Sequence, residues 1–283
     1  MGEYQNIPGE LRAGRATATP DAFINASELQ LKIYCKKFEV AGEENIRTIR
    51  EMRNSDPDNK FVIASSHFSD QDVQSAVKVL GRDLNIQVTG ESTLLAQPQV
   101  RAYMKIVGKD NFTALSYKPA DKNERGIFNP DDFKTLEQQM EAGKTPWIAA
   151  HKFGRGSNLE QAKIGPLYLA QKTNSYVIPT AMEIRGGKNV KLDESMVAPI
   201  KQVLNRLDIV YHVGAPVRFE PVDVRPLDLL FEKRKSGQKI TEEDFAAARA
   251  AHNKLKQQAE QLSLLIASML PEEQRGKYAE SPA

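Results

Sequence analysis

The sequence has one cysteine, no long apolar run and almost no net charge, and each of these absences excludes a class of protein. Cys35 cannot form a disulfide within the chain, which is typical of a reducing compartment. No stretch approaches the ~20 consecutive apolar residues of a membrane-spanning helix, and the first residues lack the basic and apolar segments of a signal peptide. These features predict a cytoplasmic location.

The charge balance and several missing motifs exclude further classes. The 283 residues include 39 basic and 37 acidic side chains, and the basic residues are not interleaved with aromatic ones, so nothing indicates nucleic-acid binding. Nucleotide loops of the Walker and Gly-x-Gly-x-x-Gly types are absent, as is the Gly-x-Ser-x-Gly motif of serine hydrolases. The composition that remains is that of a globular protein long enough to bury an ordinary core.

What the chain does contain is a regular alternation of short apolar runs and helical patterns. Residues 61–64, 147–150 and 176–182 are apolar runs bounded by polar residues, which is typical of strands buried on both faces of a sheet. Residues 207–213 are predicted to form a further strand, and segments with helical spacing lie between the runs. Strands that alternate with helices predict an α/β fold, with a mostly parallel sheet flanked by helices.

Four segments are predicted along the chain. Residues 1–25, with several prolines and glycines, are predicted to form an N-terminal arm, and residues 26–240 the α/β domain. Residues 241–270 are predicted to form a long helix that packs on the domain or on a partner, and residues 271–283 a tail.

The long helix has the clearest boundaries. Thr241 and Asp244 have the spacing of a capping box, and Pro271 ends the pattern. Apolar residues recur every three or four positions between these limits, which predicts a seam against another element. His252 falls within that stripe and is therefore predicted to be a packed histidine rather than a ligand.

A histidine and an aspartate follow the first of the apolar runs. His67 comes just after residues 61–64, at the carboxyl end of a predicted strand, where α/β sheets present their sites. Asp72 falls one turn into the next helix, where its carboxylate can orient one ring nitrogen and leave the other to act as a base. A structural interpretation competes with this one, because Ser69 and Asp72 also have the spacing of a capping box.

This arrangement resembles the glycerophospholipid acyltransferase family, whose signature is His-x-x-x-x-Asp after a buried strand. Further blocks resemble the family in the same order along the chain; they are residues 38–45 with a Gly-x-Glu-Asn turn, residues 146–155 with a Gly-Arg pair, residues 163–165 and residues 176–182. The Trp-Ile-Ala opening of the second block is closer to the soluble glycerol-3-phosphate acyltransferases than to the membrane-embedded lysophosphatidate enzymes.

The resemblance implies transfer of a fatty acyl group from acyl-CoA or acyl carrier protein to a hydroxyl of glycerol 3-phosphate or a lysophospholipid. His67 is then the general base and Asp72 the residue that orients it, with no metal and no cofactor beyond the thioester co-substrate. An amine or a sugar hydroxyl as acceptor would keep the same role for His67. The resemblance also implies a site for the acceptor phosphate, and its predicted residues are Lys152, Gly154, Arg155 and Lys163.

One block departs from the family, and this departure supports a rival hypothesis. His151 stands near the position of the usual glutamate, as expected for a lipid-binding or scaffold protein whose acyl chemistry is lost or altered. His67, Asp70, Asp72 and His151 could also be combined in a metal site, although their spacing fits no closed zinc pattern.

Two smaller interpretations complete the hypothesis. His212 lies in a strand pattern and is predicted to be a satisfied core or edge histidine. Residues 29–38 mix apolar residues with lysines, which suits peripheral contact with an anionic membrane, and an amphipathic helix packed on the sheet explains the same pattern.

Overall fold

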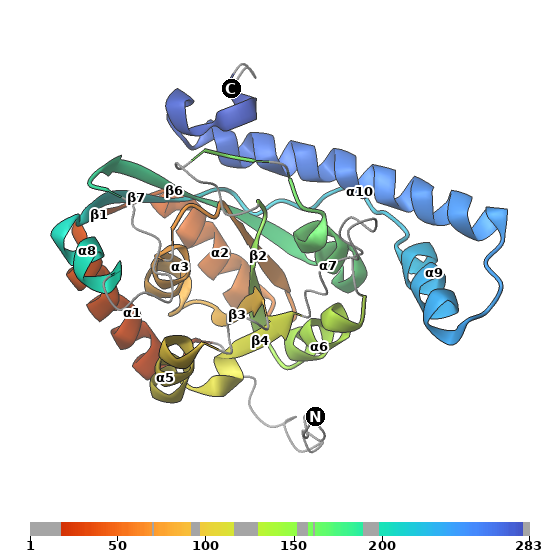
Figure 1. Ribbon diagram of the computed structural model, residues 1–283, viewed down its shortest axis with the longest axis horizontal. Helices are drawn as coiled ribbons and strands as arrows, with labels where there is room; N and C mark the ends of the chain where they lie inside the picture. The colour runs from red at the N-terminus through yellow and green to blue at the C-terminus, as the bar shows by residue number, and fades with distance from the viewer. Residues whose placement is uncertain are drawn as a thin grey trace.

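A seven-stranded sheet forms the centre of the protein (Figure 1). The computed structural model describes residues 18–69, 71–91, 97–115, 130–151, 158–160, 162–188 and 198–279. The strands follow the order β1-β7-β6-β2-β5-β3-β4. Their bounds are β1 Cys35–Ala41, β2 Phe61–Ser65, β3 Asn85–Glu91, β4 Phe112–Leu115, β5 Lys144–Ala149, β6 Tyr176–Gly186 and β7 Leu207–Val213. The five strands from β6 to β4 run parallel, while β7 and β1 run the opposite way, so the predicted mostly parallel α/β sheet is confirmed.

One face of the sheet is covered by helices from the first half of the chain; they are α1 Asp21–Tyr34, α2 Glu43–Ser55, α3 Asp72–Leu80 and α5 Pro98–Val107. Phe23 of α1 and Ile49 of α2 are fully buried in the core that also contains Phe61 and Ile63 of β2. All five side chains of β2 are buried because helices cover both faces of this central strand.

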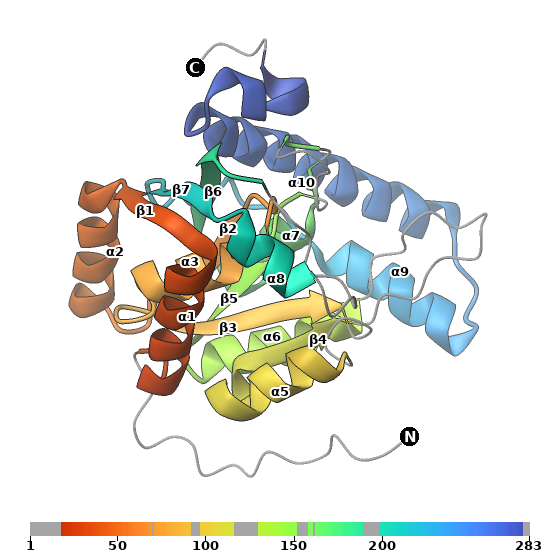
Figure 2. The same ribbon diagram turned by 60° about the vertical axis from the view of Figure 1, so that its left-hand side comes forward.

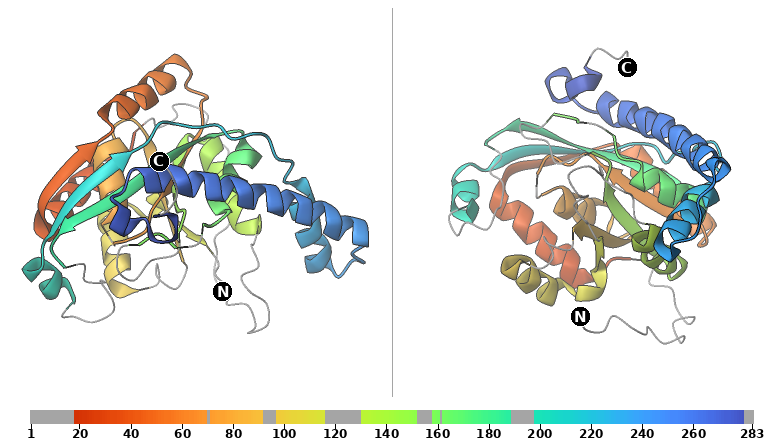
Figure 3. Two further views of the ribbon diagram at one scale, coloured as in Figure 1. Left: turned by 90° about the horizontal axis from the view of Figure 1, so that it is seen from above. Right: turned by 45° about the vertical axis from the view of Figure 1, so that its right-hand side comes forward.

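The other face is covered by helices from the second half; they are α6 Pro130–Glu141, α7 Gly165–Thr173, α9 Arg225–Ser236 and α10 Glu242–Ser268. Figure 3 shows α10 lying across this face, opposite α1 and α5. The predicted capping box of α10 is confirmed, since Thr241 Oγ1 accepts from the backbone N–H of Asp244 and the Asp244 carboxylate accepts from that of Thr241. None of the helices that the structure describes is both long enough and apolar enough to cross a bilayer.

The Gly-x-Glu-Asn turn after β1 has a structural reason. Gly42 adopts φ +87°, and a Cβ at this position would lie 2.0 Å from the carbonyl oxygen of Val213, so a side chain is excluded. Asn45 Nδ2 donates to the same carbonyl over 2.9 Å. The turn therefore joins the end of β1 to the end of β7.

Several predicted boundaries differ from the structure. Helix α1 begins at Asp21 and places Phe23 in the core, so the predicted arm ends too late. His252 is exposed and was wrongly placed in the packed stripe; α10 instead buries mainly small residues and leucines. Helices α8 (Ala198–Leu204) and α9 were not predicted, and α9 has no fully buried residue that could produce a clear apolar period.

The end of the chain is packed rather than loose as far as the structure describes it. Two short 3-10 turns follow α10; they are η2 Glu272–Gln274 and η3 Gly276–Tyr278. A third turn that the structure describes, η1 Lys109–Asn111, lies elsewhere, before β4. The Gln274 side-chain amide donates to the Ile184 carbonyl and accepts from the Ile184 N–H, so it continues the hydrogen bonding of β6. Tyr278 is 4% exposed and belongs to the core under α10.

The connections that follow β2 and β5 pack on opposite faces of the sheet, which favours a ligand site at the carboxyl ends of these strands. Figure 2 shows these neighbouring parallel strands, paired at Ile63 and Trp147. The chain leaves β2 through α3, which packs on the first face, and leaves β5 through α7, which packs on the second. Where adjacent parallel strands send their connections to opposite faces, a crevice opens at their carboxyl ends.

Candidate active site

His67 lies directly beyond the carboxyl end of β2, as predicted. The preceding turn is held by β6, because the Ser66 N–H donates to the Thr180 carbonyl over 3.0 Å and the Ser66 Oγ accepts from the Met182 N–H over 3.0 Å. Both bonds are buried, so the backbone on which His67 stands is anchored to the neighbouring strand.

Asp72 contacts the imidazole of His67. Its Oδ2 lies 3.3 Å from His67 Nδ1, and the same oxygen accepts the backbone N–H groups of Phe68 and Ser69 over 2.9 Å each. A carboxylate at Nδ1 favours the tautomer with the proton on that nitrogen, which leaves the lone pair on Nε2. The His67 side chain is 26% exposed, so the ring can be reached from solvent.

The contacts that both interpretations of Asp72 require are present in part, while its catalytic role stays a prediction. Asp72 Oδ2 accepts from Ser69 N, as in a capping box, while the Ser69 hydroxyl donates to Gln71 Oε1 instead of accepting from Asp72 N. The tight turn at the start of α3 therefore fixes the carboxylate that orients the histidine. One oxygen serves both purposes.

Asp72 is fully buried, and burial raises the pKa of its carboxyl above the ordinary value. The hydrogen bonds from His67, Ser69 and Phe68 oppose this shift by favouring the ionised form. Asp72 Oδ1 accepts no hydrogen bond from any residue that the structure describes. The carboxylate is thus held on one oxygen and desolvated on the other.

Three buried hydroxyl groups lie on the strands beneath α3, and the sequence patterns did not predict them. Ser65 pairs with Thr180 in the sheet, and Tyr211 lies on the same face of the next strand. Burial raises the pKa of Tyr211, and the charge of Asp72 raises it further, so this phenol stays protonated. Only the register of β2, β6 and β7 brings these groups together.

Trp147 of β5 forms an apolar wall beside the histidine. The two ring centroids are 5.9 Å apart, with the planes at 77°. Trp147 is 2% exposed, and it belongs to the same core as Ile63. His67 is therefore packed against a rigid ring while Asp72 holds it by hydrogen bonding.

His151 contacts α10. It is fully buried after β5, with Nε2 2.9 Å from Ser263 Oγ of α10, and that hydroxyl donates to the Ala259 carbonyl. Nε2 is therefore the donor. Burial, together with the charges of Lys163 and Lys277, lowers the pKa of His151 to about 4. This histidine joins the end of β5 to α10.

We expect the stability of the protein to depend on pH through His151. Its folded pKa lies below the ordinary value of 6.5, so the unfolded chain binds the proton first and stability falls as the pH drops from 6.5 towards 4. The loss over this range should be about 3 kcal/mol. His151→Gln removes the titrating group, so urea unfolding at both pH values should show a smaller loss for the variant. Equal losses would contradict the assignment.

The structure places His212 and some of the residues of the hypothetical metal site. His212 Nε2 lies 2.8 Å from Glu183 Oε2, which confirms a satisfied histidine. No group of three or more histidine, cysteine or acidic side chains that could hold a metal occurs among the described residues, and Asp70 of the metal hypothesis lies outside them.

The predicted phosphate-binding block is only partly described. Lys152, Gly154 and Arg155 lie outside the described residues, so their positions stay a prediction. The side chain of Lys163 is exposed, and its N–H donates to the Ala150 carbonyl over 2.8 Å. Ala150 N in turn donates to the Ser65 carbonyl. Two backbone hydrogen bonds thus connect Lys163 to the end of the strand that carries His67.

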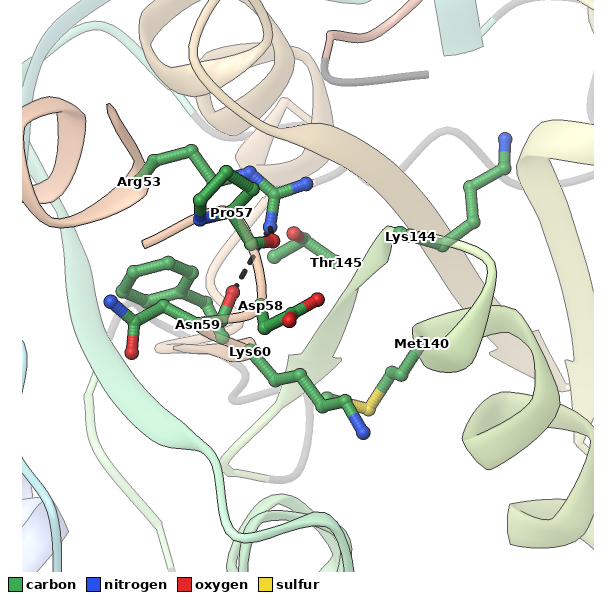
Figure 4. Close-up of a pocket in the computed structure, with 10 residues that line it drawn as sticks. Arg53, Pro57, Asp58, Asn59, Lys60, Met140, Lys144 and Thr145 are labelled. Atoms are coloured by element: carbon green, nitrogen blue, oxygen red, sulfur yellow. Dashed lines mark hydrogen bonds between the residues drawn. The ribbon is translucent and has the colours of Figure 1, made fainter. Parts of the chain in front are cut away.

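A small pocket lies at the amino-terminal ends of the parallel strands, opposite to His67, and is not part of this site (Figure 4). It lies at the start of β2 and β5, beside Phe61 and Lys144, and its volume is about 10 Å³. That volume holds roughly one water molecule. Arg53 closes it by donating to the carbonyls of Pro57 and Asn59 over 3.0 Å each.

Comparison with known proteins finds a likeness in fold to solved structures. No protein-family model matches the chain, and no curated protein matches its sequence. The fold is similar to the crystal structure of the 1-acyl-sn-glycerophosphate (LPA) acyltransferase PlsC from Thermotoga maritima, at 14% sequence identity and a TM-score of 0.45. The match covers 86% of this chain and 78% of that chain. A likeness at this level carries no argument about activity.

Proposed function

We propose that this protein is an acyltransferase that moves a fatty acyl group from acyl-CoA or acyl carrier protein to a hydroxyl of glycerol 3-phosphate or a lysophospholipid. The observation that carries the proposal is the His67–Asp72 pair at the carboxyl end of the central strand. The geometry supports a base, and the resemblance of the surrounding blocks supports the substrates.

The serines near His67 favour attack by a hydroxyl from the substrate. Ser65, Ser66 and Ser69 are at most 1% exposed, and the Ser66 Oγ is occupied by the Met182 N–H. None of the three presents a hydroxyl to a substrate. A base with no serine nucleophile beside it among the described residues suits direct transfer better than a covalent acyl-enzyme.

In the proposed step, His67 Nε2 removes the proton of the acceptor hydroxyl while its oxygen attacks the thioester carbonyl. The tetrahedral intermediate then collapses, the C–S bond breaks, and the imidazolium returns the proton to the thiolate. Asp72 stabilises the imidazolium between these events through Nδ1. Lys152, Gly154, Arg155 and Lys163 are proposed to bind the acceptor phosphate.

A lipid-binding or scaffold protein without acyl chemistry is the second candidate. The observation in its favour is His151, which replaces the usual glutamate and is buried against Ser263. In this case Asp72 would serve only to hold the turn before α3, and His67 would have no catalytic role.

Release of free thiol from acyl-CoA separates the two candidates. We expect release that depends on the acceptor, and Arg155→Ala should raise the acceptor KM with little change in kcat. The loss of a charge-assisted phosphate contact is about 1.5–3 kcal/mol. Arg155→Lys should restore part of it, because the charge remains while the fork geometry is lost.

Three different results would change this proposal. Background release with every acceptor, while lipid still binds, favours the second candidate. An acceptor KM that responds to Lys152→Ala or Lys163→Ala but not to Arg155→Ala indicates a phosphate site with a different register. No response to any of the three variants indicates an acceptor without a phosphate.

A further inference from the structure

Exposed apolar side chains gather on α1 and α8. Half of the large hydrophobic residues that the structure describes as exposed lie on these two helices; they are Leu29 (58% exposed), Ile33 (41%), Ile200 (61%), Val203 (42%) and Leu204 (79%). The helices contact each other and lie side by side in Figures 1 and 3. We call these five residues the α1–α8 surface.

The surface is rigidly supported from beneath. On α1, Leu31 is 2% exposed and packs against the sheet, so Leu29 and Ile33 point outward from a helix that is already anchored. Arg206 follows α8 and donates to the carbonyls of Lys32 and Cys35 at the end of α1. The outward apolar residues are thus held in place without a partner that the described residues provide.

Basic side chains surround the same surface. Lys32, Lys36, Lys188 and Lys201 are all exposed. An open groove of about 650 Å³ lies between the end of β6 and α8, and Lys36, Lys188 and Arg206 line it together with one acid, Asp208. The chain as a whole is nearly neutral, so this concentration of cations is local. Apolar side chains within a basic rim complement an anionic lipid surface.

The α1–α8 surface lies at the end of the sheet where the parallel strands have their carboxyl ends, and His67 lies at the same end. Strand β6 runs parallel to β2, and it ends at Gly186 beside the groove. Strands β1 and β7 run the opposite way and begin at this end, next to α1 and α8. The carboxyl end of β2, where His67 stands, therefore faces the same side of the molecule as the α1–α8 surface.

We infer that the α1–α8 surface docks the protein on an anionic bilayer. The apolar side chains enter the boundary between headgroups and acyl chains, and the lysines bind lipid phosphates. This orientation turns the carboxyl edge of the sheet, with His67, towards the lipid. The docking does not depend on the proposed acyl transfer and can be measured without it.

The test is co-sedimentation of the full chain with phosphatidylcholine vesicles, with and without phosphatidylglycerol. We expect binding only to the anionic vesicles, and weaker binding at high salt because lipid charge is screened. The double variant Leu29→Glu/Leu204→Glu should lower the partition coefficient at least about tenfold. The matched control is Leu229→Glu/Leu265→Glu, which changes exposed leucines on α9 and α10, away from α8 in Figure 1.

A second variant keeps the test decisive if the first does not fold. Lys36→Glu/Lys188→Glu changes only exposed cations and should weaken binding to anionic vesicles by a similar factor. The inference is overturned if the wild-type protein does not sediment with anionic vesicles at low salt, or if the control loses as much binding as the test variant. It is also overturned if the chain forms a dimer that Leu29→Glu/Leu204→Glu converts to a monomer, because the surface then binds a second copy.

Discussion

Replacing His67 with alanine is expected to lower kcat for acyl transfer by about 10²- to 10⁴-fold, the range of general base catalysis. The acceptor KM should change little, because the base acts mainly in the transition state and contributes little to binding of the ground state. The fold should survive, since the turn at this position is held by backbone bonds and by Ser66 rather than by the imidazole.

The measurement is thioester consumption at saturating acceptor, with thermal unfolding as the check on folding. His252→Ala is the matched control, because it removes an exposed histidine from α10 and should leave kcat unchanged. A His67→Ala protein that folds and turns over at the wild-type rate would remove His67 from the chemistry. The proposed function would then lose the observation that carries it.

Replacing Asp72 with asparagine should separate activity from stability. The N–H groups of Phe68 and Ser69 require an acceptor at the Oδ2 position, so the amide oxygen takes that place and can still accept from His67 Nδ1. The tautomer is kept and the negative charge is lost. We expect kcat to fall by about 10²- to 10³-fold, the scale of a lost electrostatic partner for charge that develops in the transition state.

The same variant should lose activity without losing stability at neutral pH. Burial raises the pKa of Asp72 in the folded state, so the unfolded chain ionises this residue first as the pH rises. The wild-type protein therefore loses stability relative to the asparagine variant above the ordinary aspartate pKa, and at pH 7 the variant should be equally or more stable. Urea unfolding at acid and neutral pH measures this difference.

Two further readouts test the role of Asp72. The loss should appear in kcat, with the acceptor KM near its wild-type value, because the carboxylate acts on the imidazolium that forms in the transition state. A purely structural cap would leave kcat unchanged in a variant that folds. A loss of more than ~1 kcal/mol of stability at pH 7, the usual size of a hydrogen bond, would show that the charge itself supports the fold.

The local elements could be predicted from the sequence because their signals are local. Strand β7 has the predicted limits, and α10 begins at the predicted capping box. The His67–Asp72 pair belongs to the same group, since the two residues are five positions apart where a strand passes into a helix. Apolar periodicity and short-range hydrogen bonds involve residues a few positions apart, so they can be recognised in the sequence.

The surfaces and the buried contacts depended on long-range packing. A helical stripe shows which residues share a face, but it does not show whether another element covers that face. For this reason the stripe on α10 did not show that His252 is exposed. The pattern of α1 likewise did not show that α8 lies beside it.

The sequence by itself determined the α/β class and the contact between His67 and Asp72, because each depends on residues close together in the chain. Only the tertiary structure decided that His151 is a buried partner of Ser263, that Ser65, Thr180 and Tyr211 lie near Asp72, and that the α1–α8 surface lies at the same end of the sheet as His67. These relations arise from strand register and from the face that each connection takes. Both are properties of segments far apart in the chain, which no local pattern contains.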